Sequence, residues 1–129
     1  MLAANRQFYA AVEQMFQGKL DAMREVWSHA ADVVYMNPTG NYDRGWAEVL
    51  KDWEGQAALK LGGKIEPQNM LVVIGSDLAV VYNSEVGENT NAKGKVERVN
   101  LRGTNIYRKE NGKWLMIGHH TDLLPFLVK

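Results

Sequence analysis

Apolar residues recur at helical spacing in the first half of the chain. In the first such stretch, Phe8, Val12 and Met15 fall three or four positions apart and so share one face of a helix. Gly18 follows this stretch and is suited to end a helix. The same spacing returns twice, the last time with Trp46 on the apolar stripe. The helices predicted in this way span residues 3–16, 20–30 and 43–59.

The second half of the chain changes to β-branched, aromatic and alternating residues, which are typical of strands. Predicted strands cover residues 32–38, 65–74, 78–88, 96–109 and 113–121. Asn111-Gly112, between the last two, is a strong signal for a tight hairpin. Helices followed by an antiparallel meander indicate an α+β fold with helices packed on one face of a curved sheet. We expect one domain over residues 1–129.

Strand alternation divides the side chains between two faces of the predicted sheet. One face of the strand over 96–109 carries the apolar set and should face the helices, whereas the Arg-rich face should meet solvent or a partner. The inward set comprises Val99, Leu101, Gly103, Asn105 and Tyr107. The strand over 78–88 is apolar on both faces, so the orientation of Glu85 stays open.

Composition and charge exclude several functions. Lysine plus arginine and aspartate plus glutamate number 15 each, and this zero formal charge disfavours nucleic acid as a partner. The chain contains no cysteine, which rules out disulfides and thiolate chemistry. No apolar run is long enough to span a membrane, and the N-terminal stretch lacks the order of a signal peptide. We therefore expect a cytoplasmic protein.

Two of the three histidines, His119 and His120, are adjacent on the last predicted strand. Neighbouring strand residues point to opposite faces, so the pair cannot bind one ion together, and His29 lies elsewhere. We expect no metal site and no cofactor. His119 shares its face with Leu115 and Ile117 and is placed in the pocket, although a β-bulge would reverse this. It is then either a hydrogen-bonded core histidine or an acid–base group that titrates near neutrality.

Two segments resemble the NTF2-like superfamily, in particular its SnoaL-like and ketosteroid isomerase-like branch. "GKLDAMREVWSHAADVVYMNPTG" is similar to the second helix and first strand of that fold, and "TNIYRKENGKWLMIGHHTD" is similar to its closing hairpin. The resemblance covers nearly the whole chain. It implies a cone-shaped fold with a pocket between the concave sheet and the helices, and a homodimer formed through the sheet.

The resemblance also allows a test of the steroid isomerase mechanism, which needs an ionised carboxylate as base and two acidic groups to hold the enolate. The positions similar to these three groups are Asn37, before Pro38; Asn105, or Thr104 without a gap; and a site near Ala11. An amide cannot act as a general base near neutral pH. We therefore do not expect that mechanism.

A mixed pocket remains, in which His119 is the candidate catalytic residue. The other residues expected to line it are Tyr9, Tyr35, Asn37, Trp46, Trp53, Leu101, Asn105, Tyr107, Ile117 and Thr121. An apolar pocket with a few polar groups suits a small apolar or carbonyl-containing ligand. The sequence indicates a small-molecule-binding protein and supports two functions almost equally: an isomerase- or cyclase-like proton-transfer enzyme and a non-catalytic binding protein. An assembly module is the third alternative.

The C-terminal residues 123–128 are too apolar to extend into water. We expect them to cap the open end of the cone or to pack on a partner subunit.

Overall fold

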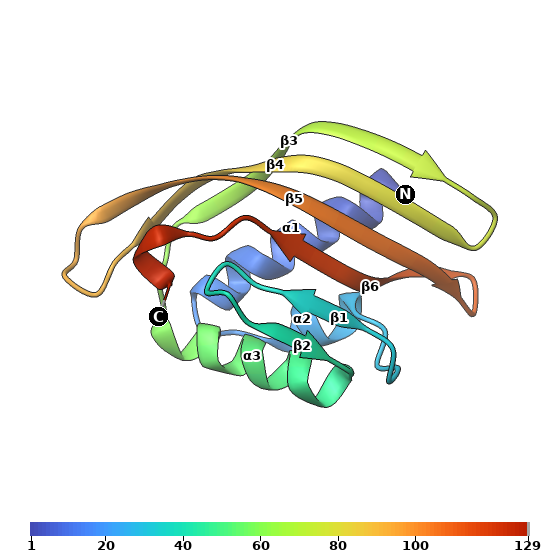
Figure 1. Cartoon of the computed structure of the whole chain (residues 1–129), viewed down its shortest axis with the longest axis horizontal. Helices are drawn as coiled ribbons and strands as arrows, with labels where there is room; N and C mark the ends of the chain where they lie inside the picture. The colour runs from blue at the N-terminus through green and yellow to red at the C-terminus, as the bar shows by residue number, and fades with distance from the viewer. Residues whose placement is uncertain (129) are drawn as a thin grey trace.

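The computed structural model describes residues 1–128 and consists of a curved sheet with helices on its concave side (Figure 1). The helices are α1 (Leu2–Phe16), α2 (Asp21–Val26) and α3 (Trp46–Leu59), with a final 3-10 turn, η1 (Pro125–Leu127). The strands are β1 (Val34–Met36), β2 (Tyr42–Arg44), β3 (Lys64–Ile74), β4 (Leu78–Thr90), β5 (Val96–Glu110) and β6 (Lys113–Thr121). This arrangement confirms the predicted α+β class.

The sheet has six strands in the order β2-β1-β6-β5-β4-β3. Strands β3 to β6 form the expected antiparallel meander, but β1 pairs with β6 in parallel, so the sheet is mixed rather than purely antiparallel. The short strand β2 was not predicted, and it delays the start of α3 to Trp46. The predicted helix over 20–30 ends early, at Val26, because Trp27 takes extended backbone and bridges to Met116 of β6.

Helix α1 lies along the concave face of the sheet (Figure 1). Its predicted apolar face is buried, with Phe8 and Met15 at most 1% exposed. Full burial of side chains of this size stabilises the fold by about 1.5–3 kcal/mol each. Two polar residues, Asn5 and Tyr9, lie one turn apart on the same buried face. In the part of the chain that the structure describes, no helix is both long and apolar enough to cross a membrane.

The alternation predicted for the strand over 96–109 is confirmed in β5, where the whole inward set is buried. The neighbouring strand β4 alternates in the same way, and its residue Glu85, opposite Leu101 in the register, is only 3% exposed. Glu85 therefore points inward, which answers the question that the sequence left open.

A β-bulge changes the faces of β6. The register passes from Ile106 opposite Gly118 to Tyr107 opposite Met116, so Ile117 is an extra residue without a partner on β5. As a result, Met116 is buried, and Leu115 and Ile117 do not share the face of His119, contrary to the prediction. His119 follows the bulge and points inward.

Candidate functional site

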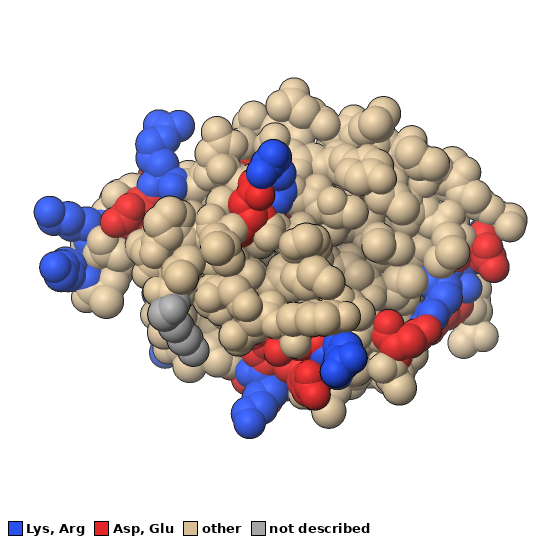
Figure 2. All heavy atoms as spheres, viewed as in Figure 1, with Lys and Arg blue, Asp and Glu red and all other residues tan. Residues whose placement is uncertain are grey.

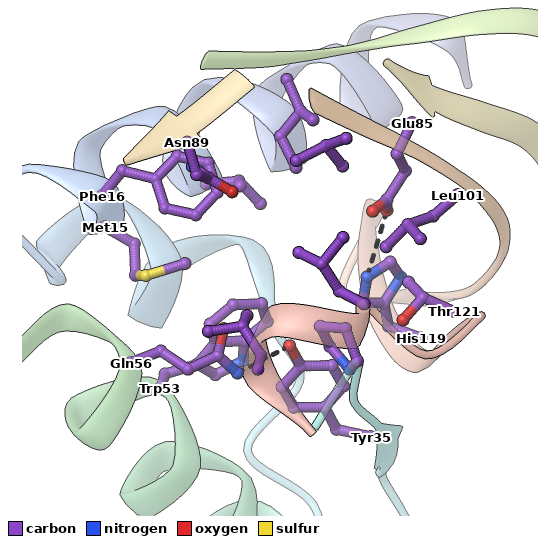
Figure 3. A pocket seen from close by; sticks show the side chains of 16 residues that line it. Met15, Phe16, Tyr35, Trp53, Gln56, Glu85, Asn89, Leu101, His119 and Thr121 are labelled. Carbon is purple, nitrogen blue, oxygen red and sulfur yellow. Dashed lines mark hydrogen bonds and ion pairs between the residues drawn. The ribbon is translucent and has the colours of Figure 1, made fainter. Parts of the chain in front are cut away.

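A narrow cavity of about 30 Å³ lies between the concave face of the sheet and helices α1 and α3. Figure 3 shows it from close by, with Glu85, Leu101, His119 and Thr121 along one side. Five residues that the sequence assigned to a pocket line this cavity. They are Tyr35, Trp53, Leu101, His119 and Thr121.

Three predicted pocket residues lie outside the lining for local reasons. The side chain of Asn37 holds a turn, because its Oδ1 accepts hydrogen bonds from the Thr39 and Asn41 backbone and its Nδ2 donates to Asp52. Hydrogen bonds of this kind from a side chain to the backbone of a turn are typical of asparagine. Trp46 stacks on His29, with ring centroids 4.3 Å apart. Ile117 is displaced by the bulge in β6.

The other three predicted residues, Tyr9, Asn105 and Tyr107, are buried but do not line the cavity. They belong instead to a polar cluster that contacts two lining residues, Glu85 and His119. These three side chains therefore lie next to the cavity, behind the residues that line it, and not in the lining as the sequence predicted.

The central feature of the cavity wall is a buried pair, Glu85 and His119. The distance from His119 Nε2 to Glu85 Oε2 is 3.4 Å, and the two residues are 4% and 3% exposed (Figure 3). That distance would permit an ion pair, but burial disfavours both charges. Burial raises the pKa of Glu85 to about 7 and lowers the pKa of His119 to about 3. When the pair holds one proton, that proton therefore resides on Glu85 and not on His119.

This distribution corrects one expectation from the sequence. The sequence predicts His119 as the inward group that titrates near neutrality, but its buried ring stays neutral and Glu85 titrates there instead. A strand pattern does not show how completely a side chain is buried, so the sequence could not assign these pKa shifts.

Asn105 fixes the tautomer of His119. The distance between Asn105 Oδ1 and His119 Nδ1 is 2.5 Å. An amide oxygen can only accept, so Nδ1 carries the hydrogen and the lone pair of Nε2 faces Glu85. The assignment of the amide atoms is supported by the other side of Asn105, where Nδ2 donates to Asn5 Oδ1 at 2.9 Å.

The hydrogen bonds continue from Asn5 and return to the pair. Asn5 Nδ2 donates to Asn83 Oδ1 at 3.1 Å, and Asn83 Nδ2 donates to Tyr9 OH at 2.9 Å. Tyr9 OH then donates to Glu85 Oε2 at 2.8 Å. These bonds, with the Glu85–His119 and His119–Asn105 contacts, close a circle that we call the polar ring. It consists of Asn5, Tyr9, Asn83, Glu85, Asn105 and His119.

Sequence reasoning missed Asn5 and Asn83 and left Glu85 undecided. A signal was present, because Asn5 and Tyr9 are one turn apart on the apolar face of a predicted helix. Buried polar groups need hydrogen-bond partners, so polar residues on the inward face of a helix and on the inward face of a strand together indicate that they bond to each other.

Two lining residues also carry buried polar atoms that lack a hydrogen-bond partner within residues 1–128. These atoms are Thr121 Oγ1 and Trp53 Nε1. An unpaired buried polar atom costs about 1–3 kcal/mol, so such atoms are candidate contacts for a ligand. Beside Trp53, Gln56 Nε2 donates to Tyr35 OH at 2.9 Å (Figure 3).

A larger hollow, of about 620 Å³, lies between α1, α2 and the start of β6. Its ionisable side chains, Glu25 and Lys113, are exposed. It therefore has no counterpart to the buried Glu85–His119 pair, and the narrow cavity is the better candidate site. Within residues 1–128, no cluster of three or more histidine, aspartate or glutamate side chains is arranged to hold a metal ion.

Comparisons with solved structures show the same fold. A candidate dehydratase of the NTF2-like family from Streptomyces avermitilis is 20% identical with a TM-score of 0.83, over 95% of this chain and 92% of that one. A candidate calcium/calmodulin-dependent protein kinase type II association domain from Thiobacillus denitrificans is 24% identical with a TM-score of 0.79, over 95% and 94%. A candidate ketosteroid isomerase from Shewanella frigidimarina is 21% identical with a TM-score of 0.74, over 93% and 92%.

These identities are too low to transfer an activity, and the three relatives differ in described function, so they establish the fold alone. No curated protein matches the sequence. The family model of the SnoaL-like domain matches residues 1–123, which is almost the entire chain. The chain therefore belongs to the SnoaL-like domain family, within the NTF2-like fold.

Proposed function

We propose that this protein binds a small uncharged carbonyl compound in the narrow cavity and moves a proton on it through Glu85. The observation that supports this proposal is the buried Glu85–His119 pair on the cavity wall. A general acid–base group works best when its pKa lies near the working pH, and burial brings the pKa of Glu85 to about 7.

The chemistry follows from the protonation of the pair. The ionised fraction of Glu85 takes a proton from a carbon beside the ligand carbonyl, and the electrons of that C–H bond move onto the carbonyl oxygen. Protonated Glu85 is then held by the neutral Nε2 of His119, until it returns the proton to another atom of the ligand. This scheme replaces the expected role of His119 as the acid or base with a supporting one.

The cavity wall favours an uncharged ligand. The described lining residues include no lysine or arginine that could hold an anion, and most are apolar. Thr121 Oγ1 and Trp53 Nε1 offer donors to a carbonyl oxygen. The steroid isomerase arrangement is not proposed, because Asn37 and Asn105 stand where its carboxylates would be.

Deuterium exchange tests proton abstraction without knowledge of the natural substrate. The protein is incubated with cyclohexanone or 2-tetralone in deuterated buffer, and deuterium on the carbon beside the carbonyl is measured by mass spectrometry. We expect incorporation that depends on the protein and is lost in Glu85→Gln. The control is Glu88→Gln, an exposed glutamate on the same strand. Binding of these ketones without exchange would instead support the non-catalytic alternative.

A second proposal, self-association through the outer face of the sheet, rests on exposed apolar side chains there. Leu71 and Tyr82 are opposite each other on β3 and β4 and are 62% and 46% exposed, and Val73 nearby is 58% exposed. Figure 2 shows that the surface over β3 and β4 is mostly uncharged. One structural relative is described as an association domain.

Sedimentation equilibrium tests this second proposal. We expect a dimer that dissociates when Tyr82→Lys places a charge at the centre of the outer face. Lys51→Glu, at an exposed position on α3, is the control. A monomer in the unaltered protein at all concentrations would contradict the proposal.

A further inference from the structure

The narrow cavity is too small for any organic ligand as it stands. Its volume of about 30 Å³ is enough for one water molecule. Part of the wall must therefore move before a ligand binds. Most of the wall is formed by helices α1 and α3 and by hydrogen-bonded strands of the sheet, which are held by many backbone bonds. The exception is the C-terminal segment, which we define as residues 122–128.

The C-terminal segment lies where the cavity comes nearest to solvent. Among the described lining residues, only Pro38 and Leu127 are partly exposed, and all the others are buried. Pro38 and the segment are joined by a single backbone hydrogen bond, in which Leu124 N donates to Pro38 O at 2.9 Å. Leu124 and Leu127 both line the cavity, and Figure 1 shows η1 beside the end of α3.

The C-terminal segment is held at its first residue by an ion pair, and two of its later side chains are largely exposed. Leu123 is 55% exposed and Val128 is 46% exposed, so these side chains contribute little burial. At the start of the segment, Asp122 forms an ion pair with Arg102, which we call the Arg102–Asp122 clip. Its Nε–Oδ2 and Nη2–Oδ1 distances are 2.8 and 3.0 Å. This pair is exposed to solvent, where ion pairs contribute little.

We infer that the C-terminal segment is a lid that opens beyond the Arg102–Asp122 clip, and that Leu124 and Leu127 occupy the space which the apolar part of the ligand takes. This inference rests on the proposed function, in which a ligand binds in the cavity, but opening of the lid can be measured without that ligand. The apolar part of a ligand that replaces two leucine side chains is itself branched or cyclic hydrocarbon. Opening of the lid then controls access to Glu85 and His119.

Thiol labelling tests the lid without any substrate. The chain has no cysteine, so Val99→Cys places a single thiol on the cavity wall. Its rate of reaction with methyl methanethiosulfonate, a small uncharged reagent, is measured by mass spectrometry under native conditions. Leu101→Cys is a second position on the same wall, in case the first variant folds poorly. Val33→Cys, in the core and outside the lining, reports global unfolding.

Each thiol is then combined with a change in the lid. We expect Leu124→Ala to speed labelling at position 99 about tenfold or more, because it removes the buried anchor. Arg102→Gln should speed it by up to about fivefold, because only an exposed pair is lost. Leu123→Ala, on an exposed leucine of the same segment, should leave the rate unchanged.

Two results would overturn the inference. One is a labelling rate at both cavity positions that Leu124→Ala and Arg102→Gln leave unchanged. The other is an equal increase at the Val33→Cys thiol, which would mean that the whole fold opens rather than the lid. Neither result depends on catalysis. A failed deuterium exchange would therefore not contradict the lid, and a labelling result without a lid would not contradict proton transfer by Glu85, which is tested by deuterium exchange.

Discussion

The Glu85→Gln variant tests whether Glu85 is protonated in the folded protein. Glutamine has the shape of a protonated glutamate. Both contacts of the carboxyl group involve the same atom, Oε2, which accepts from Tyr9 OH at 2.8 Å and lies 3.4 Å from His119 Nε2. Glutamine places either its oxygen or its NH2 group there, so it keeps one of these contacts and loses the other at every pH. Unlike glutamate, it cannot become charged inside the fold. The difference in stability between the two proteins should therefore be constant where Glu85 is protonated and change where it ionises.

The expected difference follows from the pKa of Glu85, which rises from 4.5 to about 7 on folding because the group is buried. A raised pKa gives a contribution to stability that is complete below pH 4.5 and is lost as pH rises through 7. The interval is about 2.5 pH units at about 1.36 kcal/mol each, so the loss is about 3 kcal/mol. The lowered pKa of His119 acts in the opposite direction, with stability lost as pH falls from 6.5 towards 3, but both proteins share it.

Urea denaturation at a series of pH values measures this difference. The lost contact should make the variant about 0.5–1.5 kcal/mol less stable at pH 4.5. Between pH 4.5 and pH 8 the difference in free energy of unfolding should shift by about 3 kcal/mol in favour of the variant. Glu88→Gln, at an exposed position on the same strand, should show no such trend. A gap between Glu85→Gln and the parent that stays constant with pH would refute the neutral pair.

Two further variants test the polar ring. Tyr9→Phe removes the donor to Glu85 and one of the two acceptors of Asn83 Nδ2, so urea denaturation should show a loss of about 1–3 kcal/mol, and carbon NMR should show a Glu85 pKa above 7. An unchanged pKa would mean that this bond does not stabilise the carboxylate. Asn105→Asp places a carboxylate against the Nδ1 hydrogen of His119 and should raise its pKa from about 3, as followed by imidazole NMR shifts. A pKa that stays near 3 would contradict the tautomer assigned here.

The sequence predicted those parts of the fold that depend on local periodicity. The apolar face of α1 and the alternation of β5 are strong patterns, because one side of each element is buried and the other is exposed to solvent. The tight turn at Asn111-Gly112 is set by residues that accept positive φ, and both have it. Each of these features can be read from a few neighbouring residues.

Features that depend on distant partners were not predictable in the same way. The bulge at Ile117 is fixed by pairing with β5 and by the contact of Met116 with Trp27, which is remote in the sequence. The inward orientation of Glu85 was hidden because both faces of β4 are apolar, one against the core and one on the outer surface. The pKa of His119 depends on complete burial, which involves α1, α3 and β1 as well as its own strand.

The direction of the hydrogen bonds in the polar ring has a consequence for how fast the buried proton exchanges with water. Asn5, Asn83 and Asn105 each donate through NH2 on one side and accept through C=O on the other. An amide cannot pass a proton from its oxygen to its nitrogen as a carboxyl or an imidazole can, so the three asparagines insulate the Glu85–His119 proton from the rest of the ring. Its remaining route to solvent is the cavity. The proton therefore equilibrates with bulk water only when the cavity opens, so the rate at which deuterium from the buffer reaches Glu85 is limited by that opening.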